Sequence, residues 1–166
     1  MKSIALIGMP GSGKSEIGKA LAEKIGYNFI DMDEYIEFIS CKKIADIFEE
    51  GEEVFRNYES EACVLLGNMK SSVISSGGGV VKRAKNILNL KKNSVIVFID
   101  RPLNDIADDI NLQTRPLLKG GMGRLYELYN ERIELYRNLC DFEVGNGSTI
   151  DDCVKKIIKE YLRRYG

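Results

Sequence analysis

The sequence contains no histidine and no tryptophan among its 166 residues. The absence of histidine excludes Ser-His-Asp and Cys-His nucleophilic pairs, zinc sites built on histidine, and imidazole general bases. Any proton acceptor must therefore be a carboxylate, a lysine, a tyrosine, a thiolate or water.

Cysteine is scarce, and long apolar runs are absent. The four cysteines lie far apart and form no C-x-x-C pair, which excludes a zinc knuckle and a thioredoxin-type motif: Cys41, Cys63, Cys140 and Cys153. The N-terminal stretch MKSIALIGMPGSGKS lacks the apolar segment and cleavage site of a signal peptide, and no apolar run is long enough to span a bilayer. We therefore expect a cytoplasmic protein whose thiols are reduced and mostly packed in the interior, although two disulfides are formally possible.

An excess of charge of either sign is also missing. Lys plus Arg total 24 and Asp plus Glu total 25, so the formal net charge is -1. This balance argues against a general nucleic-acid or anionic-membrane binder, which needs a basic face. The length and the 44% hydrophobic content suit one domain over residues 1–166. We expect a monomer that acts on small molecules.

Apolar runs typical of buried strands alternate with segments of helical period. The strand-like runs are 3–7, 27–30, 72–75, 94–99 and 142–144. Helical periods cover 14–25, two or three helices between 35 and 69, then 84–90, 102–110, 125–139, and a closing helix from 150. This alternation predicts a three-layer α/β fold with a central parallel sheet of about five strands and helices on both faces. The aperiodic, glycine-containing stretch 111–123 is expected to be a mobile loop.

Residues 8–15, Gly-Met-Pro-Gly-Ser-Gly-Lys-Ser, match the phosphate-binding pattern G-x-x-x-x-G-K-[ST] at every fixed position. Glycines let successive backbone N–H groups point at phosphate oxygens, and the following helix adds its positive dipole end. A lysine brings charge to the β and γ phosphates, and a serine hydroxyl can ligate Mg²⁺. The sequence therefore predicts a nucleotide site formed by Gly11, Ser12, Gly13, Lys14 and Ser15.

Four further features follow the phosphate loop in chain order. They are Asp31-x-Asp33, Phe55-Arg56-x-x-Glu59, Gly77-Gly78-Gly79, and Arg115-Pro116-Leu117-Leu118 followed by Glu131-Arg132 and Tyr136. Together, over the full length, they resemble the shikimate kinase family, P-loop enzymes of the nucleoside-monophosphate-kinase type. That family transfers the γ-phosphoryl group of ATP to the 3-hydroxyl of shikimate, in the pathway to aromatic amino acids.

The resemblance implies a reaction centre of carboxylates, cations and metal. Asp31 would hold Mg²⁺ beside Ser15, and Asp33 would orient the reacting hydroxyl or take its proton. Lys14 and Arg115 would bracket the transferring phosphoryl group, with Arg115 on a lid of approximately residues 111–123 that closes over the nucleotide.

The resemblance also implies a substrate clamp. Arg56 and Arg132 would bind the carboxylate of the acceptor, a task that suits a planar guanidinium fork. Glu59 lies three residues after Arg56, on the same helix face, and could hold it in place. Gly77, Gly78 and Gly79 would present backbone amides to the substrate.

Each of these features also has a simpler interpretation when taken alone. An Asp of the D-x-D pair could only cap the next helix, an isolated Arg is usually a solvated surface charge, and three glycines form a flexible turn. The sequence departs from the family at 107–110, Ala-Asp-Asp-Ile, where an Arg that packs on adenine is common and none is present. The alternatives are a kinase of another small carboxylated metabolite, such as gluconate, and a non-catalytic nucleotide-binding domain.

Overall fold

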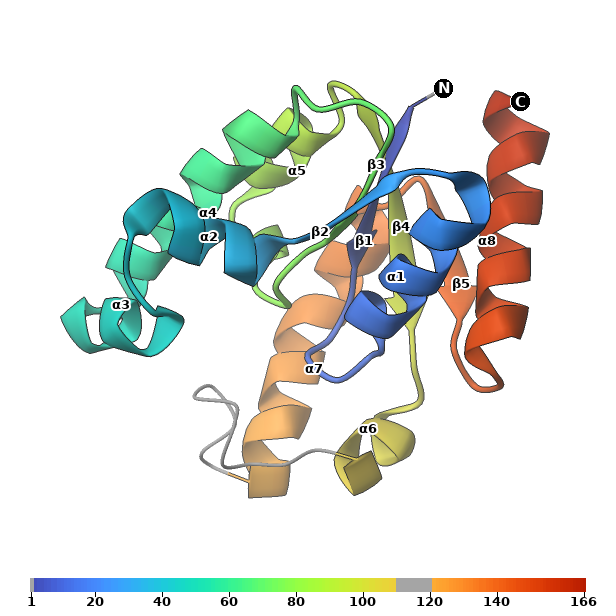
Figure 1. Cartoon of the computed structure of the whole chain (residues 1–166). Coiled ribbons are helices and arrows are strands. Elements are labelled where there is room, and N and C mark those ends of the chain that lie inside the picture. The colour runs from blue at the N-terminus through green and yellow to red at the C-terminus, as the bar shows by residue number, and fades with distance from the viewer. Residues whose placement is uncertain (1, 110–120) are drawn as a thin grey trace.

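The computed structural model describes residues 2–109 and 121–166. Five parallel strands form one central sheet in the order β2-β3-β1-β4-β5 (Figure 1). The strands are β1 (Ser3–Ile7), β2 (Asn28–Asp31), β3 (Ser72–Ser75), β4 (Ser94–Asp100) and β5 (Phe142–Gly145). The predicted fold class is confirmed, and each predicted strand lies within a residue of its observed position.

Helices cover both faces of the sheet, as predicted. They are α1 (Lys14–Ile25), α2 (Met32–Ser40), α3 (Ile44–Glu50), α4 (Glu52–Leu66), α5 (Ala84–Leu90), α6 (Leu103–Asp109), α7 (Gly121–Leu139) and α8 (Ile150–Tyr165), with a short 3-10 helix, η1, at Val80–Lys82. Helices α1 and α8 lie together on one face, and α4, α5 and α7 pack on the other side (Figure 1). In the part of the chain that the structure describes, no helix is long and apolar enough to cross a membrane.

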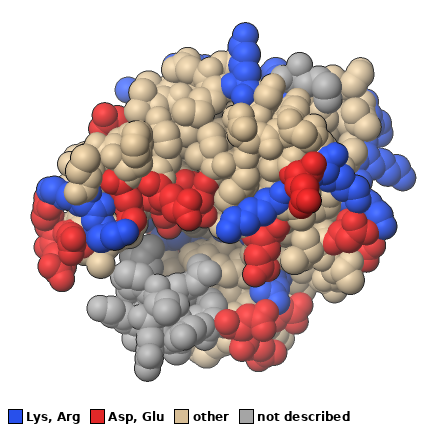
Figure 2. Space-filling model, viewed as in Figure 1, with Lys and Arg blue, Asp and Glu red and all other residues tan. Residues whose placement is uncertain are grey.

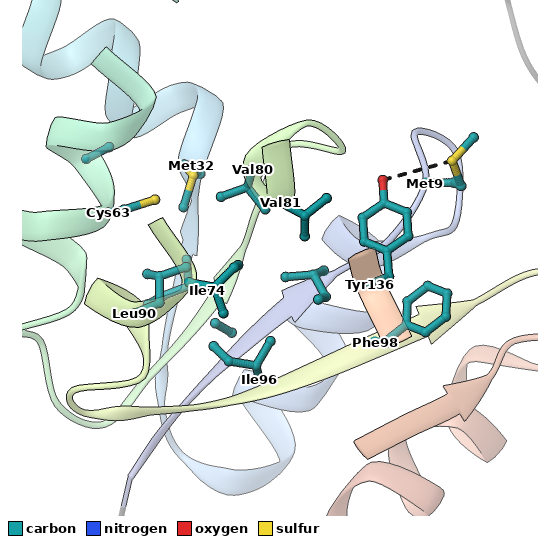
Figure 3. Close-up of a cluster of buried hydrophobic side chains, with 14 of the residues drawn as sticks. Met9, Met32, Cys63, Ile74, Val80, Val81, Leu90, Ile96, Phe98 and Tyr136 are labelled. Carbon is teal, nitrogen blue, oxygen red and sulfur yellow. Dashed lines mark hydrogen bonds between the residues drawn. The ribbon is translucent and has the colours of Figure 1, made fainter. Parts of the chain in front are cut away.

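The strand side chains divide the interior into two cores. Along β1, Ala5 and Ile7 face one helix layer, whereas Ile4 and Leu6 face the other. This alternation explains why the strand sequences are continuously apolar, since both faces of a parallel sheet are covered. In the larger core, the rings of Tyr136 and Phe98 stack with centroids 5.1 Å apart beneath the phosphate loop (Figure 3).

The surface agrees with the balanced composition. Figure 2 shows acidic and basic side chains interspersed on the visible face. Among the described residues all four cysteines are free, as expected. Only Cys63 and Cys153 are buried, however, and Cys41 is exposed, so the expectation that most thiols lie in the interior is met for two of the four.

One predicted boundary was wrong. The loop was expected to reach residue 123, but Gly121 to Gly123 form the first turn of α7. The glycine penalty is about 1 kcal/mol per residue in a helix, and the packed side chains of Leu125 and Leu128 anchor the turns that follow. Tertiary packing therefore extends the helix toward its N-terminus, to Gly121, ahead of the residue at which its apolar pattern begins. Residues 111–120 of the predicted lid lie outside the described residues.

Candidate active site

The phosphate loop connects β1 to α1 in a conformation that requires glycine. Gly13, the N-cap residue of α1, has φ 90° in the left-handed region. A Cβ at Gly8 would lie only 2.6 Å from the Ile99 carbonyl oxygen of β4, so the loop packs directly on the neighbouring strand. The loop leaves the carboxyl end of β1, where a change in strand order places the ligand site of an open parallel sheet. The predicted position of the nucleotide site is consistent with this geometry.

Lys14 is buried within the loop that it is expected to serve. Its side chain is 7% exposed, and Nζ donates to the carbonyl oxygens of Gly8 at 2.9 Å and Met9 at 2.8 Å. These hydrogen bonds hold the ammonium group against the backbone of the loop.

Ser15 and Asp31 meet at the carboxyl ends of three strands. Ser15 Oγ donates to Asp31 Oδ2 at 2.9 Å and lies 3.0 Å from Ser75 Oγ. The other carboxylate oxygen of Asp31 accepts from the backbone N–H of Asp33 at 2.9 Å and so caps α2. Asp31 therefore performs the simpler capping role and also reaches Ser15.

The residues at this point fit a magnesium ion. A carboxylate and two hydroxyl oxygens are hard ligands, which Mg²⁺ prefers, and Mg²⁺ commonly takes only one or two protein ligands beside phosphates and water. Within residues 2–109 and 121–166, no group of three or more carboxylate or thiol residues gathers to form an all-protein metal site. Asp31 and Ser15 are thus suited to a metal that arrives with a nucleotide.

Arg56 and Glu59 form a buried ion pair on α4. Arg56 Nη1 donates to Glu59 Oε1 at 2.9 Å, and the two side chains are 3% and 1% exposed. Burial alone would lower the pKa of Arg56, but Glu59 and Glu52 outweigh it and raise that pKa. For Glu59, burial raises the pKa above its ordinary value, and Arg56 only partly offsets the rise. The predicted support of Arg56 by Glu59 is confirmed.

The glycine triplet packs against the phosphate loop and α4. A Cβ at Gly79 would lie 2.4 Å from the Arg56 guanidinium, and one at Gly78 would lie 2.6 Å from Pro10 of the phosphate loop. At Gly77, a Cβ would lie 3.6 Å from Asp33 Oδ1. Close approach therefore favours glycine at Gly78 and Gly79, whereas a Cβ at Gly77 would meet its neighbours at nearly ordinary contact distances.

Two buried residues of α7, Tyr136 and Arg132, belong to this part of the molecule. Tyr136 donates its hydroxyl to the Gly78 carbonyl oxygen, and burial raises its pKa to about 12. Arg132 is 1% exposed, and its Nε and Nη1 have no hydrogen-bond partner among the described residues. Burial raises the pKa of Glu59, and Arg56 and, more weakly, Arg132 both lower it. A buried guanidinium with unused donors is suited to an anionic ligand.

A cavity of about 660 Å³ joins these groups. Among the residues that line it are Gly11, Gly13, Lys14, Ser15, Asp31, Asp33, Arg56, Glu59, Gly77, Gly78 and Gly79. Most of the predicted site residues are thus brought to one space. Arg132 and Ser12 are buried and are not among the lining residues. Arg115 lies outside the described residues.

Three residues near this cavity were missed by reasoning from sequence. Ser75 ends β3, Arg101 follows β4, and Asn146 follows β5. Arg101 donates to the Gly11 carbonyl oxygen at 3.0 Å and pairs with Asp109, and Asn146 donates to the Ser12 carbonyl oxygen at 2.9 Å. Their positions after sheet strands were a usable signal, since such residues collect at the ligand edge.

A phosphate loop at the change in strand order, faced by carboxylates and buried guanidinium groups, defines a P-loop kinase. The family model described as shikimate kinase matches residues 10–162. The chain belongs to the shikimate kinase family.

Individual relatives agree with this assignment. The chain is 49% identical over 154 residues to the shikimate kinase of Clostridium beijerinckii, with 93% of this chain and 91% of the relative covered. Its fold matches that of a shikimate kinase from Acinetobacter baumannii, solved in complex with shikimate, with a TM-score of 0.93, 30% identity, and 99% and 95% of the two chains covered.

A gluconokinase bears on the alternative acceptor. The gluconokinase of Sinorhizobium meliloti matches with a TM-score of 0.60 and 16% identity, over 99% of this chain and 98% of that one. At that identity the likeness extends to the fold alone. The comparisons therefore support the shikimate kinase assignment over the gluconate alternative and over a non-catalytic nucleotide-binding domain.

Proposed function

We propose that the chain acts as a single domain that transfers the γ-phosphoryl group of ATP to the 3-hydroxyl of shikimate. The observation that carries the choice of a carboxylated acceptor is the burial of two guanidinium groups, that of Arg56, which lines the cavity together with the phosphate loop, and that of Arg132. Arg132 retains unused donors among the described residues, and a carboxylate is the simplest group to satisfy them.

The nucleotide would lie against the phosphate loop. The N–H groups at the start of α1, together with Lys14, would neutralise its phosphates. Ser15 and Asp31 would hold Mg²⁺, which when bound neutralises charge on the β and γ phosphates. Arg115 is proposed to add positive charge from the lid.

The acceptor would lie between the glycine triplet and α4. Arg56 and Arg132 would fix its carboxylate, and the amides of Gly77, Gly78 and Gly79 would meet its polar groups. Asp33 lines the cavity beside Gly77 and would accept a hydrogen bond from the reacting hydroxyl. Because phosphoryl transfer passes through a loose transition state, positioning contributes more to the rate than basicity, so one carboxylate is enough.

The experiment measures ADP release with shikimate, gluconate, a nucleoside monophosphate or no acceptor. We expect release with shikimate and Mg²⁺; release with gluconate alone would refute the choice of acceptor, and release independent of any acceptor would refute a kinase of small molecules.

The role of Asp33 has its own test. Asp33→Asn should lower turnover by roughly a hundredfold or more with ADP affinity nearly unchanged, the range expected for a group that assists proton transfer. Asp152→Asn is the matched control, because Asp152 is likewise an exposed Asp in the first turn of a helix. Normal turnover of Asp33→Asn would show that this carboxylate does not assist the acceptor hydroxyl.

A further inference from the structure

Asn146 connects the loop after β5 to the phosphate loop, 134 residues earlier in the chain. Its side-chain Nδ2 donates to the Ser12 carbonyl oxygen at 2.9 Å. Its own backbone N–H donates to the carbonyl oxygen of Asp100, at the end of β4, at 2.7 Å. The backbone of Asn146 is therefore anchored to the sheet, and its side chain holds one peptide group of the phosphate loop.

The peptide group held by Asn146 is the one that joins Ser12 to Gly13. In a trans peptide the C=O and N–H bonds point in opposite directions, so a fixed Ser12 carbonyl fixes the direction of the Gly13 N–H. Gly13 is the N-cap residue of α1, and the first N–H groups of a helix have no partner within it. Asn146 therefore orients an N–H group that helix formation leaves available.

The approach of Asn146 depends on the glycine. A Cβ at position 13 would lie 2.9 Å from Asn146 Nδ2, and the φ of 90° is unfavourable for any side chain. Gly13 thus serves two purposes, since it permits both the loop conformation and the contact that fixes it.

The preceding peptide group shows why this hydrogen bond differs from a general brace. Arg101 donates to the Gly11 carbonyl oxygen at 3.0 Å, on the peptide between Gly11 and Ser12. The N–H of that peptide already donates to the Met9 carbonyl oxygen at 3.1 Å, inside the loop. Arg101 therefore stabilises a closed turn, whereas Asn146 holds the peptide group whose N–H belongs to the N-cap residue of α1.

We propose that Asn146 is a positioning residue for the nucleotide, which directs the Gly13 N–H at a phosphate oxygen. The proposal rests on the nucleotide half of the proposed function and not on the identity of the acceptor. A charge-assisted hydrogen bond from an N–H group to phosphate is sensitive to direction. A water molecule in place of the Asn146 side chain would not be anchored to the sheet, so it would leave the orientation of the Ser12–Gly13 peptide group less fixed.

The test compares ADP and inorganic pyrophosphate as ligands of the Asn146→Leu variant. Leu keeps the branching of Asn and removes the donor. The matched control is Asn93→Leu, because Asn93 Nδ2 also donates to a backbone carbonyl, that of Gly67, at 2.9 Å, at the amino end of β4. Calorimetry should show a roughly tenfold rise in Kd for ADP in Asn146→Leu, as expected when one charge-assisted hydrogen bond is lost, and little change in the control.

The Kd of pyrophosphate distinguishes the loss of a phosphate contact from the loss of a contact to the base. Its competition against ADP measures its own Kd, which should rise by a similar factor, because it carries the phosphates without base or sugar. A loss for ADP alone would overturn the assignment to phosphate, and an ADP affinity within twofold of the unchanged protein would overturn the role of Asn146. If Asn146→Leu unfolds far below the control, Asn146→Ala, which removes the donor without adding bulk or charge, replaces it under the same criteria. Because no acceptor is present, a failure of the shikimate assignment would leave these results unchanged.

Discussion

Replacing Arg56 by methionine should destabilise the protein in a way that depends on pH. The substitution keeps an unbranched, apolar chain in the helix but leaves the buried Glu59 without its nearest countercharge. Removing one partner of a buried ion pair typically costs about 3–5 kcal/mol. We expect about 3 kcal/mol at neutral pH, because Glu59 can escape part of the cost by taking up a proton.

The sign of the pH dependence follows from Glu59. Burial already raises its pKa, Arg56 opposes that rise, and Asp33 and Arg132 act in opposite directions, so losing Arg56 should raise the pKa further. A carboxyl group whose pKa is higher in the folded chain than in the unfolded chain stabilises the fold at low pH. That contribution is lost as the pH rises from the ordinary value of 4.5 through the raised one. The deficit of the variant should therefore be small in acid and large above neutrality.

Urea unfolding without substrates at about pH 5 and about pH 8 measures this difference. Arg124→Met is the control, since Arg124 pairs with Glu127 at 3.0 Å on the surface, where the loss should stay below about 1 kcal/mol. The double variant Arg56→Met with Glu59→Gln should regain much of the stability, because the unpaired buried charge is gone. An equal deficit at both pH values, or no recovery in the double variant, would refute this reasoning.

Two further predictions concern the same region. Gly79→Ala should raise the KM for shikimate several-fold, with little change in the KM for ATP, because its Cβ would lie 2.4 Å from the Arg56 guanidinium. A KM for shikimate equal to that of the unchanged protein in steady-state assays would contradict this. Burial raises the pKa of Tyr136 to about 12, so the stability that it contributes should be present below pH 10 and lost between about pH 10 and about 12, where the unfolded chain alone is deprotonated. Tyr136→Phe should remove roughly 2 kcal/mol of this alkaline loss in urea unfolding, whereas an unchanged pH profile would place the titration elsewhere.

The sequence was sufficient for the layers and the strands. Continuous apolar runs marked β1 and β4 because both faces of a parallel sheet are covered, and the phosphate-loop pattern fixed where β1 ends and α1 begins. The resemblance placed Arg56 and Asp33, which the fold then brings to one cavity. Periodicity was less reliable at Gly121, where packing of the later turns extends the helix into glycines.

The contacts that set the direction of backbone groups could not be predicted. Asn146 and Arg101 each follow a sheet strand, which indicates the ligand edge, but their partners could not be predicted, since these are carbonyl oxygens, which every residue possesses. The triplet at Gly77–Gly79 was recognisable, but its reason was not, because the need for glycine arises from Pro10 and Arg56 in other parts of the chain. Sequence motifs identify candidate catalytic and binding side chains, whereas the tertiary structure decides which backbone groups are held by hydrogen bonds from distant residues.

The balanced net charge conceals an imbalance in the interior. Among the described residues, the charged side chains that are buried are Lys14, Arg56, Glu59 and Arg132, three cations and one anion. Arg56 has carboxylate partners in Glu59 and Glu52, and Lys14 donates to two loop carbonyl oxygens, whereas Nε and Nη1 of Arg132 have no hydrogen-bond partner among the described residues. A buried donor without a partner is costly, and an acceptor carboxylate is a group that would remove this cost on binding. Such a ligand would stabilise the folded state by mass action.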